Sequence, residues 1–100
     1  MVDSGLKAEA VLENQISSVE LKDGPAVIVT RLDGQLVAFS AVCPHASGDF
    51  REGELHRGRV YCPVHQWKFD LKSGRCMGDE NYRLKKFPVV EQDGKIMLDV

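Results

Sequence analysis

The chain has 100 residues, of which 43% are hydrophobic and 28% are charged, proportions that are typical of a soluble globular protein. This length predicts a single domain over residues 1–100, because two separate cores would each bury too little surface. The formal charge of −2 argues against nucleic acid as a partner. No stretch approaches the roughly 20 apolar residues of a membrane helix, and no secretory leader is visible, so we expect a cytoplasmic protein.

Short runs of apolar and β-branched residues, separated by turn dipeptides, predict the secondary structure. The predicted strands are, in chain order, 7–12, 26–32, 36–40, 59–61, 67–70, 87–90 and 96–100. Asp33-Gly34 and Asp93-Gly94 each lie between two such runs, which is the signal for a β-hairpin. Residues 11–21 fit neither a helical nor a strand period well, and Met1 to Gly5 are expected to fray. The sequence therefore predicts an all-β fold.

Two short motifs, Cys43-Pro44-His45 and Cys62-Pro63-Val64-His65, dominate the chemistry of this chain. Sixteen residues separate them, and each follows a predicted strand, which places both on loops. Two thiolates and two imidazoles suit iron–sulfur or zinc chemistry, whereas calcium and magnesium prefer oxygen ligands. The proline in each motif restricts the backbone, so less entropy is lost when a metal orders the site.

The pattern Cys-x-His, about sixteen residues, Cys-x-x-His resembles the Rieske [2Fe–2S] family, in which two histidines replace two cysteines on one iron. The resemblance continues through the aromatic–Asp strand 67–70 and the turn Ser73-Gly74, and it covers roughly residues 36–74. It implies a small domain of short antiparallel sheets with a cluster-binding subdomain formed by two loops. It further implies that one iron of a single [2Fe–2S] cluster is held by Cys43 and Cys62, and the other by His45 and His65.

The alternative is a zinc-stabilised binding module, in which the same four ligands hold a structural zinc ion. It is less favoured, because zinc knuckles usually group Cys-x-x-Cys or His-x-x-His within one loop. The third cysteine, Cys76, is expected to be a small buried residue. The third histidine, His56, is expected on a solvated surface loop.

Residues near the motifs indicate which kind of Rieske centre this is. High-potential members of the family have an extra cysteine in each loop, joined as a disulfide, where this chain has Gly48 and Val64. They also place Ser and Tyr hydroxyls where this chain has Trp67 and Phe69. Fewer donors to sulfur predict a potential in the lower part of the approximate Rieske range of −150 to +300 mV. These differences favour the soluble ferredoxin type.

Three further expectations concern the surroundings of the site. Trp67 is expected mainly to pack in the core beside its strand. The segment 77–82 lacks the prolines that often cover the cluster in the family, so its path is not predicted. A basic cluster between the motifs is interleaved with Glu52 and Glu54 and is expected to be a solvated loop; its members are Arg51, Arg57 and Arg59.

The sequence lacks the groups for a second catalytic iron site and for a nicotinamide or flavin site. Once the cluster takes two histidines, only His56 remains, so a second site for catalytic iron is excluded, and no dinucleotide-binding glycine motif is present. The resemblance therefore implies a monomeric one-electron carrier between a flavin-dependent ferredoxin reductase and a terminal ring-hydroxylating oxygenase, as in aromatic hydrocarbon catabolism. The alternative within the family is the small subunit of an assimilatory nitrite reductase.

Overall fold

The computed structural model describes residues 1–22, 24, 26–44, 48–64, 67–78 and 81–100. Within these residues the chain forms short strands and two single-turn 3-10 helices, η1 and η2, and it contains no α-helix. The prediction of an all-β fold is confirmed. The elements are β1 (Val2–Lys7), η1 (Ala8–Ala10), β2 (Ser17–Val19), β3 (Val27–Leu32), β4 (Gln35–Ser40), η2 (Phe50–Glu52), β5 (Glu54–His56), β6 (Arg59–Tyr61), β7 (Lys68–Asp70), β8 (Lys86–Phe87), β9 (Val89–Gln92) and β10 (Lys95–Leu98).

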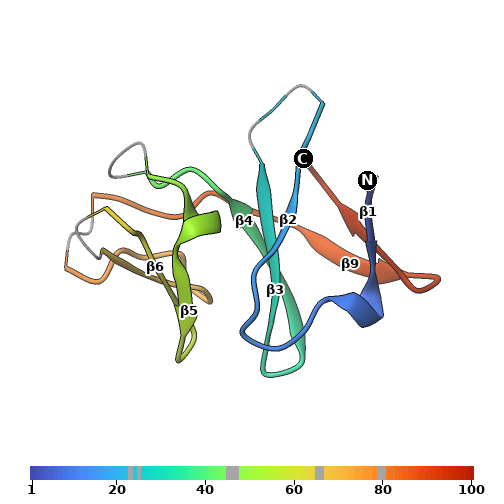
Figure 1. Ribbon diagram of the computed structural model, residues 1–100, viewed down its shortest axis with the longest axis horizontal. Coiled ribbons are helices and arrows are strands. Elements are labelled where there is room, and N and C mark those ends of the chain that lie inside the picture. The colour runs from blue at the N-terminus through green and yellow to red at the C-terminus, as the bar shows by residue number, and fades with distance from the viewer. Residues whose placement is uncertain (23, 25, 45–47, 65–66, 79–80) are drawn as a thin grey trace.

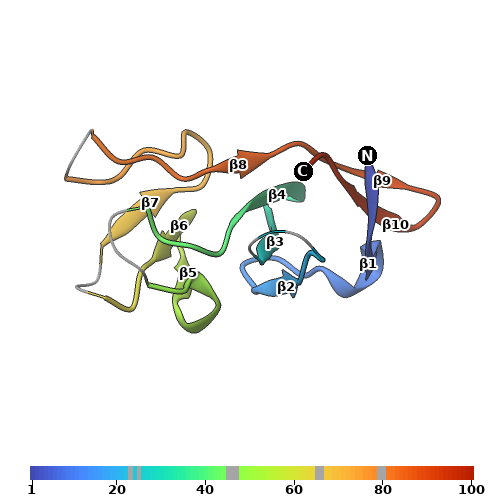
Figure 2. The same cartoon turned by 90° about the horizontal axis from the view of Figure 1, so that it is seen from above.

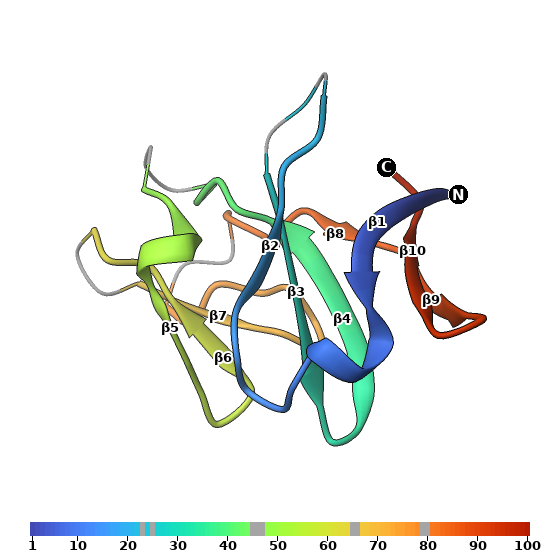
Figure 3. The same cartoon turned by 45° about the vertical axis from the view of Figure 1, so that its right-hand side comes forward.

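The strands form three antiparallel sheets. A terminal sheet has the order β1-β10-β9, a central sheet the order β2-β3-β4-β8, and a third sheet the order β5-β6-β7. The β5–β7 sheet and the terminal sheet lie at opposite ends of the long axis, with the central sheet between them (Figures 1 and 3). Seen from above, β8 connects the β5–β7 end of the molecule with the terminal sheet (Figure 2).

Three hairpins turn through pairs of residues with positive φ, the backbone that two-residue type I′ turns require. Asp33 and Gly34, at φ 53° and 79°, join β3 to β4, and Asp93-Gly94 joins β9 to β10 in the same way. Both predicted hairpins are thus confirmed. The third turn, Arg57-Gly58 between β5 and β6, was not predicted, because arginine is an uncommon first residue for this turn.

The N-terminal part of the chain differs from the prediction. The strand expected at 7–12 is instead β1, which ends at Lys7 and is followed by η1. The first residues do not fray, because Val2 and Asp3 pair with β10. A strand so far from its partner in sequence cannot be found from local patterns. Both β2 and β5 are short strands that were also missed, so His56 lies on a strand rather than a loop, although it is exposed as predicted.

Two hydrophobic cores lie on either side of the central sheet. One, between the central and terminal sheets, includes Val27, Val29, Ile96 and Leu98. The other joins the central sheet to the β5–β7 sheet and is crossed by three fully buried phenylalanines in edge-to-face contact. Their ring centroids lie 5.8 Å apart for Phe39–Phe50 and 5.6 Å for Phe50–Phe69. No helix of the described residues is long and apolar enough to cross a membrane.

Candidate metal centre

Both motifs begin in hairpin loops of the same length. The first ligand loop, residues 43–48, is bounded by the antiparallel bridge between Val42 and Asp49. The second ligand loop, residues 62–67, is bounded by the pair Tyr61 and Lys68 in β6 and β7. The prediction that both motifs follow strands is confirmed for the described residues, while His45 and His65 lie outside them.

Each ligand loop is closed by one backbone hydrogen bond between its first and last residues. The amide of Cys43 donates to the carbonyl of Gly48 at 3.0 Å, and the amide of Cys62 donates to the carbonyl of Trp67 at 2.7 Å. The two motifs have different spacing, but their cysteines occupy the same position at the start of equivalent loops. Such closure fixes the backbone around each cysteine before any metal binds.

The structure brings the two thiols together in the interior. Cys43 is 2% exposed and Cys62 is fully buried, and both belong to the core that contains the phenylalanine stack. Burial raises the pKa of the Cys62 thiol; a hydrogen bond from the Val64 amide to the sulfur acts in the opposite direction, and the adjacent Cys43 thiol adds to the increase. Metal binding at these two thiols would require both to lose their protons, so it would release protons.

Gly48, at the end of the first ligand loop, lies close to the second ligand loop. A Cβ atom at this position would lie 2.7 Å from the Cys62 Sγ and 3.6 Å from the Val64 Cβ. Gly48 and Val64, the positions matched by resemblance to a disulfide, therefore do lie side by side. This space beside a buried sulfur is kept free of side chain atoms.

A second glycine holds η2 close to β6, immediately before Cys62. A Cβ atom on Gly53 would collide with the carbonyl oxygen of Tyr61. Gly53 also donates its amide to the carbonyl of Phe50 at 3.0 Å, which ends η2. The strand that leads into the second ligand loop is thus packed directly against the turn that follows the first.

The far side of the second ligand loop is covered by the segment that follows β7. The Tyr82 ring packs edge-on against Trp67, with centroids 5.5 Å apart, and the Cys76 amide donates to the Tyr82 carbonyl at 3.3 Å. Trp67 packs against the core, and Cys76 is buried, as both were predicted to be. At Tyr82, the end of segment 77–82 therefore lies against the second ligand loop.

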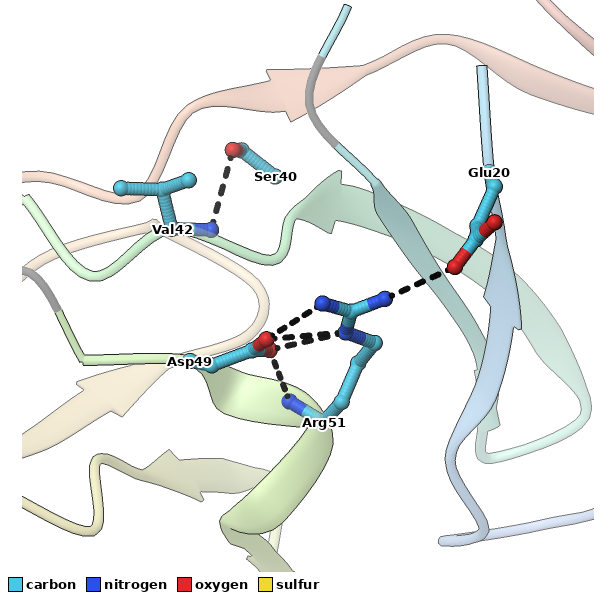
Figure 4. A network of polar contacts seen from close by, with 5 residues as sticks. All are labelled: Glu20, Ser40, Val42, Asp49 and Arg51. Atoms are coloured by element: carbon cyan, nitrogen blue, oxygen red, sulfur yellow. Dashed lines mark hydrogen bonds and ion pairs between the residues drawn. The ribbon is translucent and has the colours of Figure 1, made fainter.

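An ion-pair network attaches the first ligand loop to the central sheet (Figure 4). The Asp49 carboxylate accepts the Arg51 amide at 2.8 Å, which caps η2, and accepts the Arg51 guanidinium at 2.6 Å. This side-chain hydrogen bond lowers the pKa of Asp49. Arg51 also reaches Glu20, beyond the end of β2, at 3.3 Å. Arg51 is exposed, as expected of a solvated loop. Its ion pairs with Asp49 and Glu20 were not predicted.

The family model for the Rieske [2Fe–2S] domain matches residues 5–88 of this chain. The chain belongs to the Rieske [2Fe–2S] family. Its cofactor is therefore a Rieske-type [2Fe–2S] cluster. The described residues fit this cofactor, because two buried thiols meet between two closed loops and one of the sulfurs accepts a backbone N–H, as cluster sulfurs do.

Two characterised relatives are ferredoxin components of oxygenase systems. The p-cumate 2,3-dioxygenase ferredoxin of Pseudomonas putida is 30% identical over 92 residues, which cover 90% of this chain and 78% of the relative. The alkene monooxygenase ferredoxin of Xanthobacter autotrophicus is 29% identical over 73 residues. That match covers 72% of this chain and 60% of the relative, so the chain spans less than two thirds of that protein.

Solved structures support the same fold. The ferredoxin of Sphingomonas yanoikuyae B1 superposes with a TM-score of 0.83 over 94% of this chain and 93% of that one, at 23% identity. A protein described as an NADH-dependent nitrite reductase small subunit, from Mycobacterium tuberculosis, superposes with a TM-score of 0.76 at 26% identity. The superposition covers 92% of this chain and 88% of that protein. The same fold is thus found in a protein named a ferredoxin and in one named a nitrite reductase small subunit.

Proposed function

We propose that this Rieske protein carries single electrons from a flavin-dependent ferredoxin reductase to a terminal ring-hydroxylating oxygenase, as a monomer in the cytoplasm. The family and the ferredoxin relatives identify an electron carrier rather than a catalytic enzyme. The observation that supports the proposal most is the meeting of Cys43 and Cys62 between two closed loops. We further propose that His45 and His65 complete the ligand set.

The bound cluster supplies the one-electron chemistry, and the residues of this chain determine how it is held. The two cysteines enter from the core, where the phenylalanine stack excludes water from their sulfurs. The Val64 amide donates to the Cys62 sulfur, an interaction that favours the more negative, reduced state. Phe69 is fully buried and has no hydroxyl to add a second such bond, which supports a potential low in the Rieske range.

The ligand assignment is tested by replacing one histidine at a time. We expect His45→Ala and His65→Ala to abolish the visible absorption of the cluster. His56→Ala is the matched control, because His56 lies exposed on β5 and its loss should leave the spectrum unchanged. A His65→Ala protein with the wild-type spectrum would refute the assignment.

The carrier role is tested with purified components. NADH and a flavoprotein reductase of a ring-hydroxylating oxygenase system should reduce the protein, and the reduced protein should be reoxidised by the terminal oxygenase in single turnover. Reduction by dithionite but by neither reductase nor any coupled oxygenase would contradict this role. Equal amounts of iron and acid-labile sulfide are expected, whereas stoichiometric zinc in a colourless protein would support the binding module instead.

The nitrite reductase small subunit remains the second candidate, because a protein described in that way shares the fold at 26% identity. The two functions differ in how tightly the partner binds. A free carrier should elute alone on size-exclusion chromatography of a native extract. Co-elution in a stable complex with a large enzyme would favour the subunit.

A further inference from the structure

The outer face of the β5–β7 sheet contains a strip of exposed cations. Leu55, Val60 and Phe69 are cross-strand neighbours on the inner face and pack in the core. Because side chains alternate along a strand, Lys68 and Asp70 point outward. Lys68 lies over the ring of its neighbour Tyr61, at 5.8 Å from the centroid.

The segment after β7 adds two further stretches of chain beside this outer face, one around residue 76 and one around residue 83. Cys76 bridges Phe69 and is buried, so Arg75 and Met77 point outward on either side of it. The Met77 amide donates to the Lys68 carbonyl at 2.8 Å, which places Met77 beside Lys68. Beyond Arg75, an antiparallel bridge pairs it with Arg83.

We call the exposed residues Lys68, Arg75 and Arg83 the basic strip, with Met77 as its apolar neighbour. Asp70 lies on the same face, and its amide donates to the Arg75 carbonyl at 2.9 Å. Its carboxylate accepts hydrogen bonds from the Ser73 hydroxyl at 2.9 Å and the Lys72 amide at 3.3 Å. The carboxylates at positions 79 and 80 lie outside the described residues. The strip is basic in a protein whose overall charge is −2.

Arg75 lies opposite Arg83 on one side and opposite Asp70 on the other. Like charges directly opposite on neighbouring strands destabilise a sheet, and in the described part of the chain no ion pair satisfies either guanidinium. Two other arginines, Arg31 and Arg51, do have carboxylate partners. Two open guanidinium forks match carboxylates in bidentate geometry.

We propose that the basic strip is a docking site for carboxylates on the surface of a redox partner protein. The inference rests on the carrier function proposed above. Lys68 follows the second ligand loop directly, so a footprint of about 800 Å² per partner reaches both the strip and the loop. Exposed Met77 offers the apolar contact that such interfaces favour. Nucleic acid is the competing polyanion, and the first test below compares the two directly.

The first test measures binding of poly-L-glutamate, a mimic of an acidic protein surface, to the cluster-loaded protein. Arg75→Gln/Arg83→Gln should weaken this binding several-fold at low salt. Lys7→Gln/Lys95→Gln is the matched control, because these lysines form a like-charged cross-strand pair on the terminal sheet, at the other end of the molecule (Figure 1). Equal weakening in both variants, or tighter binding of a DNA oligonucleotide than of poly-L-glutamate, would overturn the inference.

The second test measures electron transfer by stopped flow, with a flavoprotein reductase that reduces the wild-type protein and with the terminal oxygenase. With at least one of these partners, the arginine variant should react several-fold more slowly at low salt and show a flatter salt dependence, as expected when steering charges are removed. Arg75→Lys/Arg83→Lys should retain the salt dependence, because it retains the charge. An unchanged cluster spectrum shows that each variant is folded.

The two tests distinguish the inference from the function on which it rests. If the arginine variant matches wild type with both partners, the docking site is wrong and the carrier function stands. If no reductase or oxygenase exchanges electrons with wild-type protein, the carrier function fails, and the poly-L-glutamate comparison still decides whether the strip binds acidic surfaces.

Discussion

The contact between the two ligand loops predicts that a new disulfide can link them. A Cβ atom on Gly48 would lie 3.6 Å from the Val64 Cβ, within the range of about 3.5–4.5 Å found in disulfides. We therefore expect Gly48→Cys/Val64→Cys to form a bond that joins the loops. It would close a chain segment of about 15 residues, for which the chain-entropy model gives about 3 kcal/mol.

Crowding at the Cys62 sulfur reduces this gain. The new Cβ would lie 2.7 Å from the Cys62 Sγ, so the sulfur must shift, and we expect a net stabilisation of roughly 1–3 kcal/mol. For a chain of this size each kcal/mol raises the melting midpoint by about 4–8 °C. The midpoint for loss of visible absorption should therefore rise in the oxidised variant and fall again with reductant.

Gly48→Ser/Val64→Ser is the control for the disulfide variant, because it introduces the same crowding without a bond. Intact mass and thiol titration of the cluster-loaded protein identify the disulfide directly. Two free thiols after air oxidation, or a disulfide with no gain over the serine control, would refute the geometry on which the prediction rests.

Three further substitutions test the packing around the site. Gly53→Ala should prevent cluster retention because its Cβ meets the Tyr61 carbonyl, whereas Gly24→Ala, which meets only Leu21 at 3.7 Å, should retain the visible spectrum. Thr30→Val should raise the free energy of unfolding in urea by about 1 kcal/mol, because the buried Thr30 hydroxyl has no partner among the described residues; no gain would mean that the hydroxyl is hydrated. Asp49→Asn should lower stability at pH 7, and this difference should begin to shrink only below about pH 4. It should vanish at still lower pH, because the Arg51 hydrogen bond lowers the pKa of Asp49 in the folded protein; a difference independent of pH would exclude the ion pair as its cause.

The sequence was informative wherever a local pattern determines the structure. Asp33-Gly34 and Asp93-Gly94 mark their hairpins because few residues tolerate positive φ. The motif cysteines are recognisable because each stands next to a histidine at a spacing typical of metal ligands. Pairings between distant segments were not predictable in the same way. β1 pairs with β10, and Arg51 pairs with Glu20. Both pairings are tertiary contacts, and the local sequence around neither partner predicts them. The contact of Gly48 with the Cys62 sulfur likewise appears only once both loops are folded.

A one-electron carrier works best when its surroundings change little between oxidation states, and the described structure provides such surroundings. The ligand loops are each closed by a hydrogen bond, and their cysteines share a close-packed core with Phe50 and Phe69. Close packing resists displacement, and the Asp49–Arg51–Glu20 network attaches the first loop to the central sheet. Gly48 and Val64 cannot form a disulfide between the loops, so hydrogen bonds and packing hold the described parts of the loops in place. Loosening this frame at Gly53 should therefore affect cluster retention before it affects the distant terminal sheet.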